Sequence, residues 1–175
     1  EASPRGIFWP PAPHDDEGCW ERMATVVPFM QKHVATRGAA ISVDNPHEGA
    51  TYPYPLLITL SDQDEQLVFD LARAVDVHYE EYKNADPGSI GWAMDRQNFQ
   101  WVVPFHDGAV RYFQSVGVWN DEAQVHNQRL IERQNVLAQA WQAQKAENPD
   151  DFREVWMIRR AEALTAAGFD PIWRR

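Results

Sequence analysis

Histidines beside carboxylates are the residues of this 175-residue chain with the clearest capacity for chemistry. Imidazole and carboxylate groups can bind a metal ion or transfer protons, and they adjoin at His14-Asp15-Asp16 and at His47-Glu48. No histidine has the His-Glu-x-x-His spacing of a metalloprotease helix. We therefore interpret both groups as solvated loops. A small metal-dependent hydrolase that uses His14, Asp15, Asp16 and His47 is the least favoured hypothesis.

The remaining reactive groups do not form a catalytic pattern. The chain has one cysteine, Cys19, which excludes an intrachain disulfide and a multi-cysteine zinc site. A nucleophilic cysteine needs an activating base, and the sequence indicates none around Cys19. A Gly-x-Ser-x-Gly elbow and a phosphate-binding loop are both absent from the sequence. The sequence therefore predicts no catalytic residue, no metal and no cofactor, and hence a protein that is not an enzyme.

Three aromatic residues, Trp9, Tyr52 and Tyr54, stand beside prolines in extended segments. Aromatic residues in such segments often line clefts, where their polar tips orient a ligand. They also close hydrophobic cores, and this alternative is slightly favoured. We take Trp9, Tyr52 and Tyr54 as the candidate ligand-binding residues.

Composition restricts the classes of partner. The formal net charge of −10 argues against nucleic acid, whose binding proteins carry a basic stripe, and against an anionic membrane surface. No apolar run reaches the roughly 20 residues of a membrane span. The length suits one domain or one half of a larger protein.

The central stretch, residues 49–71, predicts a strand followed by a helix. Leu56–Leu60 is a short apolar run bounded by turn residues, which is typical of a buried strand. Ser61 is the expected N-cap, with Asp64 in the capping-box position. The helix is expected from about Asp62 to Lys83. These elements favour an α/β fold.

The residues before this stretch predict less regular structure. We expect a short strand at Ile7–Trp9 and a helix capped by Asp15 or Asp16. Beyond Pro28, helical spacing predicts that the helix resumes at Phe29–Val34. A second strand is expected at Ala39–Val43, and a loop at Asp44–Gly49.

The residues after it predict mainly helices. Phe99–Val103 is either a strand or an extended packing segment. A short helix is expected over Ala109–Ser115, ended by Gly117. A helical hairpin follows, in which Asn120 caps the first helix, Asn148-Pro149 separates the helices and Gly168 ends the second.

One segment carries a resemblance to a known family. Pro104-Phe-His-Asp-Gly-Ala-Val-Arg-Tyr-Phe-Gln-Ser-Val-Gly117 resembles the Pro-x-His-x-Gly-Ala-x-Arg-Tyr-Tyr-x-x-x-Gly signature of TAXI-type solute-binding proteins, except that Phe113 replaces a second Tyr. These are receptors of TRAP (tripartite ATP-independent periplasmic) transporters. The resemblance covers about Ile7 to Trp119, and some members carry a helical tail like residues 120–175.

The resemblance implies part of a two-lobed periplasmic-binding-protein-like fold, with a C-terminal helical hairpin. Whole receptors are nearly twice as long and have a glycine-rich first loop, which this chain lacks. The resemblance therefore implies that the chain is the C-terminal half of such a receptor. Residues 1–50 would belong to the second lobe. Residues 51–119 would contain the hinge-crossing strand, at 51–60, and a first-lobe segment. Residues 120–175 would be the hairpin tail.

The implied function is periplasmic solute binding without catalysis. The ligand would be a small organic anion, either a dicarboxylate or an acidic amino acid, and the membrane subunits of a TRAP transporter would recognise the closed form. His106 and Arg111 lie in the signature. We favour structural roles for both, in which His106 fixes a helix start and Arg111 pairs with a carboxylate.

The alternative is a structural or interaction module that binds no ligand and associates through its C-terminal hairpin. A homodimer and pairing with a missing N-terminal half both remain open.

Overall fold

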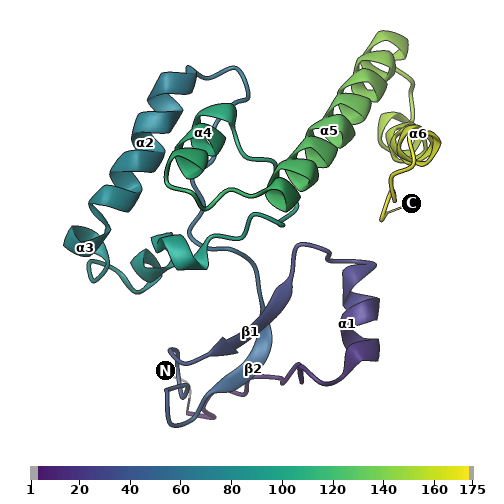
Figure 1. Cartoon of the computed structure of the whole chain (residues 1–175). Coiled ribbons are helices and arrows are strands. Elements are labelled where there is room, and N and C mark those ends of the chain that lie inside the picture. Colours follow the sequence, from purple (N-terminus) through teal and green to yellow (C-terminus); the bar gives the residue numbers. More distant parts are fainter. Residues whose placement is uncertain (1–3, 174–175) are drawn as a thin grey trace. The chain divides into compact units, whose positions relative to one another are not determined.

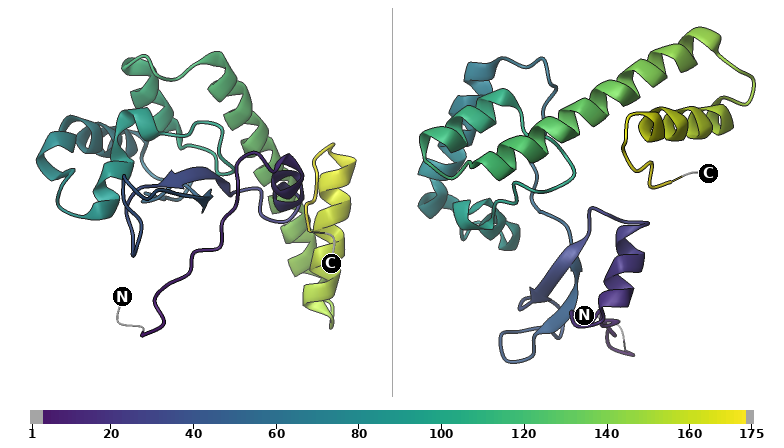
Figure 2. Two further views of the ribbon diagram at one scale, coloured as in Figure 1. Left: turned by 90° about the horizontal axis from the view of Figure 1, so that it is seen from below. Right: turned by 45° about the vertical axis from the view of Figure 1, so that its right-hand side comes forward.

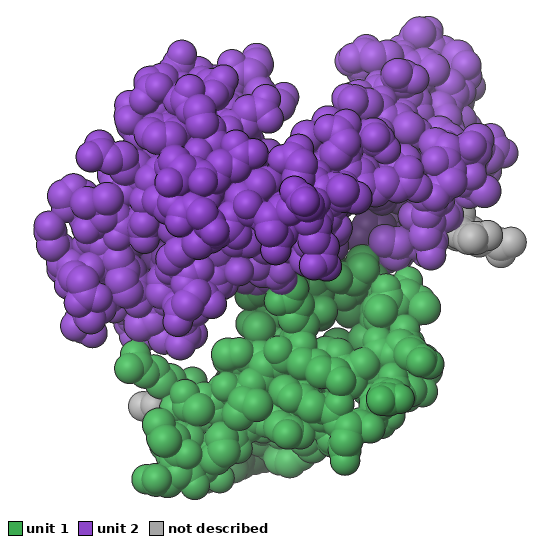
Figure 3. All heavy atoms as spheres, in the orientation of Figure 1, with its two compact units in different colours: residues 1–52 green, residues 53–175 purple. Residues whose placement is uncertain are grey.

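The computed structural model describes residues 4–173 of the chain, which divides into two compact units, residues 1–52 and residues 53–175 (Figure 3). The division falls between Tyr52 and Pro53, close to the boundary expected after residue 50. Residues 53–119 and 120–175 belong to the same unit. The coarse α/β class is confirmed, because helices dominate and the described residues also contain one two-stranded sheet.

The first unit contains one helix and the sheet. Helix α1 spans Glu17–Ala24, and its N-cap is Asp16, whose Oδ1 accepts a hydrogen bond from the backbone N–H of Cys19 at 2.9 Å. The sequence predicted Asp15 or Asp16 as this cap, and the structure selects Asp16. Strand β1 (Gln31–Ala35) pairs antiparallel with β2 (His47–Thr51), as Figure 1 shows.

Three predicted elements of this unit are wrong. Phe29–Val34 is not helical, since β1 begins at Gln31. Ala39–Val43 forms no named strand and has only an isolated bridge between Gly38 and Ile41, while β2 begins at His47, inside the predicted loop. Ile7–Trp9 is not a strand. Short apolar runs cannot distinguish helix from strand, because the choice depends on a partner distant in sequence.

The second unit is helical. Its elements, in chain order, are α2 (Glu65–Val77), α3 (Tyr79–Tyr82), η1 (Pro87–Trp92), η2 (Met94–Arg96), α4 (Asp107–Ser115), α5 (Asp121–Glu147) and α6 (Phe152–Ala166). Four aromatic rings form a cluster in this unit: Phe99, Phe105, Phe113 and Trp119. Most pairs meet edge to face or tilted, with the Phe99 and Phe113 centroids 5.0 Å apart, while Phe113 and Trp119 are stacked. Such aromatic pairs stabilise a core beyond the area that they bury.

The strand and cap predicted before α2 are also wrong. Leu56–Leu60 is irregular and exposed, because the described part of this unit offers it no partner strand. Ser61 is not the N-cap. Asp64 is the N-cap instead, with its Oδ1 accepting from the Leu67 backbone N–H at 2.8 Å. The helix expected to run to Lys83 is interrupted at His78.

The C-terminal hairpin has the predicted form. Asn120 Oδ1 accepts a hydrogen bond from the Ala123 backbone N–H at 2.8 Å and so caps α5. The turn follows Asn148, which has a left-handed φ of 42°, and α6 then lies beside α5 (Figure 2). Leu164 is completely buried in the hairpin. At its other end, α5 is tied to the loop before α4, since buried Asn127 accepts from the Phe105 backbone N–H at 2.7 Å.

Candidate functional site

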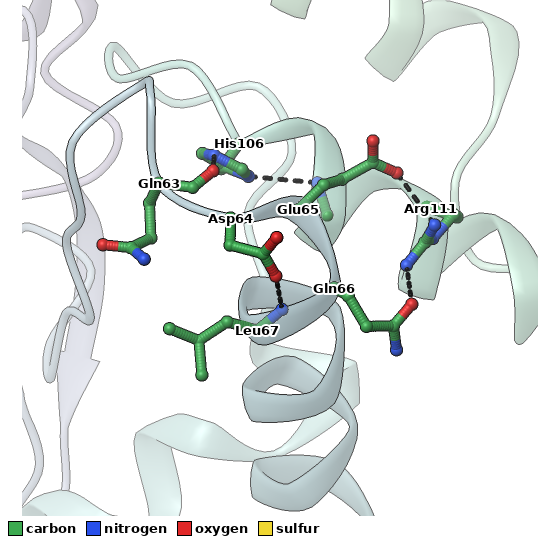
Figure 4. Close-up of polar contacts among 8 residues, drawn as sticks. Gln63, Asp64, Glu65, Gln66, Leu67, His106 and Arg111 are labelled. Atoms are coloured by element: carbon green, nitrogen blue, oxygen red, sulfur yellow. Dashed lines mark hydrogen bonds and ion pairs between the residues drawn. The ribbon is translucent and has the colours of Figure 1, made fainter.

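The family-like signature forms the contact between α4 and α2. We call this contact the clasp and define it by His106, Gly108, Arg111 and Tyr112 together with their partners between Gln63 and Asp76. Most of it is drawn in Figure 4. The two helices lie against each other along this face.

His106 connects the starts of both helices. Its Nδ1 accepts a hydrogen bond from the Gly108 backbone N–H at 3.1 Å, which caps α4. Its Nε2 lies 3.1 Å from the carbonyl oxygen of Gln63, just before α2 (Figure 4). Because Nδ1 accepts, the ring is neutral in this arrangement, and the proton resides on Nε2 and is donated to Gln63.

Gly108 allows the close approach of the helices. A Cβ atom at this position would overlap the carbonyl oxygen of Glu65 and would lie 2.9 Å from the backbone nitrogen of Phe69. Both are main-chain atoms of α2 and cannot rotate away. Glycine at residue 108 is therefore required for this helix separation.

Arg111 bridges α4 to the first turn of α2. Its Nη1 lies 3.0 Å from Glu65 Oε1, and its Nη2 donates to Gln66 Oε1 at 2.7 Å (Figure 4). The guanidinium also lies over the Phe69 ring, 4.6 Å from its centroid. The structural roles expected for His106 and Arg111 are thus confirmed.

Tyr112 fixes the far end of the same contact. It is only 4% exposed, and its hydroxyl donates to Asp76 Oδ2 at 2.6 Å. Burial, and then the hydrogen bond to Asp76, raise the pKa of Tyr112 to about 12. Its ring also packs edge to face on Phe69. The clasp is therefore a joint whose main donors and acceptors connect the two helices, and it does not present a catalytic arrangement.

The three candidate ligand-binding residues fall in both units. Trp9 is in the first unit, where its Nε1 donates to the carbonyl oxygen of Ala39 at 2.7 Å and its ring faces His47 at 6.3 Å. Tyr52 is in the same unit, directly after β2. Tyr54 is in the second unit and is 66% exposed. Within residues 4–173, the hydroxyls of both tyrosines make no hydrogen bond.

Two glycines make room for Tyr54. A Cβ at Gly88 would lie 2.9 Å from Cε1 of the Tyr54 ring, and a Cβ at Gly91 would overlap the Tyr54 carbonyl oxygen. The backbone of Tyr54 is therefore packed on η1 while its side chain remains largely open to solvent.

The histidine–carboxylate groups bind neighbouring backbone. His14 Nε2 lies 3.2 Å from the Gly49 carbonyl oxygen, and the His14 backbone N–H donates to Glu48 at 3.1 Å. Asp16 is occupied as the cap of α1. In the described part of the chain, no three His, Cys, Asp or Glu side chains gather in a group that could hold a metal ion. The geometry thus gives no support to the metal-dependent hydrolase.

A surface groove lies on the hairpin. It is shallow and open, and mostly small side chains from α5 and α6 line it, including Ala140, Ala143, Ala163 and Ala166. No helix among the described residues combines the length and the apolar character needed to cross a membrane.

The sequence did not identify the α2 half of the clasp. Glu65, Phe69 and Asp76 are its main members, and their spacing of 4 and 11 residues places them on one helical face. That shared face was the available signal. It could not be connected to α4 without knowing that the two helices pack together.

Comparison of the chain with family models, with curated proteins and with solved structures found no match.

Proposed function

We propose that this chain is the C-terminal half of a TAXI-type solute-binding protein, which binds a small organic carboxylate in the periplasm for a TRAP transporter. The observation that carries the proposal is the division of the chain between Tyr52 and Pro53. It falls within residues 51–60, where the resemblance implies a hinge. A two-lobed receptor needs a short connection of this kind, because a few hinge residues absorb the dihedral change as the lobes close.

The signature gives separate support. His106, Gly108, Arg111 and Tyr112 each contribute a different contact to one joint. A sequence resemblance whose residues act together in space is less easily explained by chance than one whose residues are scattered. The clasp would keep its lobe rigid during closure, and the membrane subunits would recognise the closed form.

Tyr52 and Tyr54 suit the proposed ligand best. A phenolic hydroxyl donates a strong hydrogen bond to a carboxylate, and both hydroxyls are free of partners in the described structure. Trp9 would contribute its ring, since its Nε1 already binds Ala39.

Thermal unfolding with added ligands tests the proposal. We expect dicarboxylates or acidic amino acids to raise the melting temperature, since a ligand at about 100 times its Kd stabilises the native state by about 2.7 kcal/mol. For a chain of this size that is a rise of roughly 5–10 °C. The matched dimethyl esters should have no effect.

Two variants identify the residues involved. Tyr54→Phe should reduce the ligand-dependent rise, while Tyr79→Phe, which also removes one hydroxyl from the same unit, should retain it. Equal stabilisation by acids and esters, or no response to any carboxylate, would contradict the proposal.

The groove on the hairpin favours the interaction module as the second candidate function. Small side chains let the backbone of another helix approach closely, so α5 and α6 could bind a partner helix. Sedimentation over a range of concentrations tests the homodimeric form. Association that Ala143→Glu abolishes would favour it, and a monomer at all concentrations would count against it.

A further inference from the structure

Residues 56–60 form an exposed apolar segment. Four of the five are large aliphatic residues, and their exposed fractions are 43% for Leu56, 55% for Leu57, 86% for Ile58 and 74% for Leu60. Single exposed aliphatic residues are common on proteins, but a contiguous apolar patch marks an interaction site. On α2, Leu67 and Leu71 are also exposed and lie one helical turn apart.

Main-chain N–H and C=O groups of this segment also lack hydrogen-bond partners in the described structure. In the part of the chain that the structure describes, the main-chain groups of residues 56–59 make no hydrogen bond. Pairing first appears at Leu60, whose carbonyl oxygen accepts from the Gln63 backbone N–H at 3.2 Å. A run of free N–H and C=O groups in a β-prone sequence is a template for pairing with another strand.

The composition of the segment indicates what kind of strand could pair with it. Residues 49–61 contain no charged side chain, although the chain as a whole carries a net charge of −10. The apolar residues are consecutive rather than alternating, which is typical of a strand covered on both faces. A charged strand would bury unpaired charge against Leu57 and Ile58, so the complementary partner is an uncharged, apolar strand.

We propose that residues 56–60 are a docking strand that adds to the edge of a β-sheet through an uncharged strand of that sheet. Main-chain hydrogen bonds would supply affinity, as in other cases of β-strand addition. This inference deepens the proposed function, on which it rests, because the N-terminal half of the receptor would supply the strand.

The test uses a soluble peptide of alternating threonine and valine with a lysine at each end, added to the 175-residue chain. Backbone amide hydrogen exchange, read at residue level, should become slower at residues 56–60 and should change little elsewhere. A fluorescent form of the peptide gives the affinity.

Two substitutions at one exposed position form a matched pair. Ile58→Pro removes the N–H needed for pairing and should weaken peptide binding at least tenfold. Ile58→Val keeps the N–H and the β-branched side chain and should bind within about twofold of wild type. Position 58 is exposed, so neither change should alter the melting temperature of the chain alone.

The outcomes separate this inference from the proposed function. Absence of protection at residues 56–60, or protection on β1, β2 or the hairpin instead, would overturn the docking strand even if carboxylates stabilise the protein. Protection at 56–60 that Ile58→Pro abolishes would support it, even if no carboxylate binds.

Discussion

At the scale of single residues, the clasp is the region whose contacts depend most on the identity of each residue. Gly108 has no room for a side chain, since main-chain atoms of Glu65 and Phe69 occupy the space that one would need. His106 contributes both ring nitrogens, one to each helix start. The family-like signature therefore specifies a joint between α2 and α4, and the proposed ligand would be held by other residues.

Gly108→Ala should destabilise the protein. The added methyl group would push α4 away from α2, and overpacking of this kind costs about 1–3 kcal/mol. Urea unfolding measures the change. Gly18→Ala in α1 is the control, because its Cβ would meet only the side chains of Arg22 and Asp16, and alanine favours the helix. A Gly108→Ala protein as stable as wild type would show that the helices do not pack this closely.

Tyr112 predicts a loss of stability at high pH. Its pKa is about 12 in the folded protein and about 10 in an unfolded chain. Between these values the unfolded chain has released a proton that the folded protein retains, so the free energy of unfolding falls as the pH rises from 10 to 12. Below pH 10 this contribution to stability is complete.

Urea unfolding from pH 9 to pH 12 tests this dependence. Tyr112→Phe should show a smaller fall over that range. A residual fall is expected from Tyr82, whose pKa is also raised, first by burial. Identical pH profiles for wild type and Tyr112→Phe would contradict the assignment.

At the scale of elements, some helix ends were predictable and the strands were not. Asp16 and Asn120 act as caps because each bonds an amide three residues away, which is a local property that the sequence displays. The positions of β1 and β2 depend on each other across a loop of eleven residues, 36–46. The signal that places one strand is therefore carried by a distant segment.

The same difference between local and long-range signals explains why the strand prediction at Leu56–Leu60 was wrong. Its apolar run does indicate a strand, but a strand forms only where a partner is present. The clasp could also be predicted only in part, because some of its contacts depend on a segment distant in sequence. His106 and Arg111 were assigned correct roles from local context, while the contributions of Asp76 and Phe69 depend on how α2 packs against α4.

Leu164 should be the strongest single contributor to the hairpin. It is completely buried, and Leu→Ala at such a site costs about 2–5 kcal/mol. Ile158→Ala, on the same helix but more than half exposed, should cost much less. Hydrogen exchange in α5 and α6 should report the loss in Leu164→Ala. Equal effects of the two substitutions would show that the helices do not pack through Leu164.

At the scale of the whole molecule, the chain consists of a small unit with a sheet and a helical unit, which meet in sequence at Tyr52–Pro53. The resemblance had implied a hinge at residues 51–60 on other grounds. Tyr52 and Tyr54 flank the division, and their free hydroxyls make them the proposed contacts for a carboxylate.

Native mass spectrometry of the protein purified from its source tests carboxylate binding most directly. The native spectrum should show the polypeptide with a retained small molecule, and denaturation of the same sample should release it as an organic acid. Release of a dicarboxylate or an acidic amino acid would support the receptor and would identify its ligand. Native and denatured masses that agree, in a sample that unfolds cooperatively and responds to no added carboxylate, would contradict it.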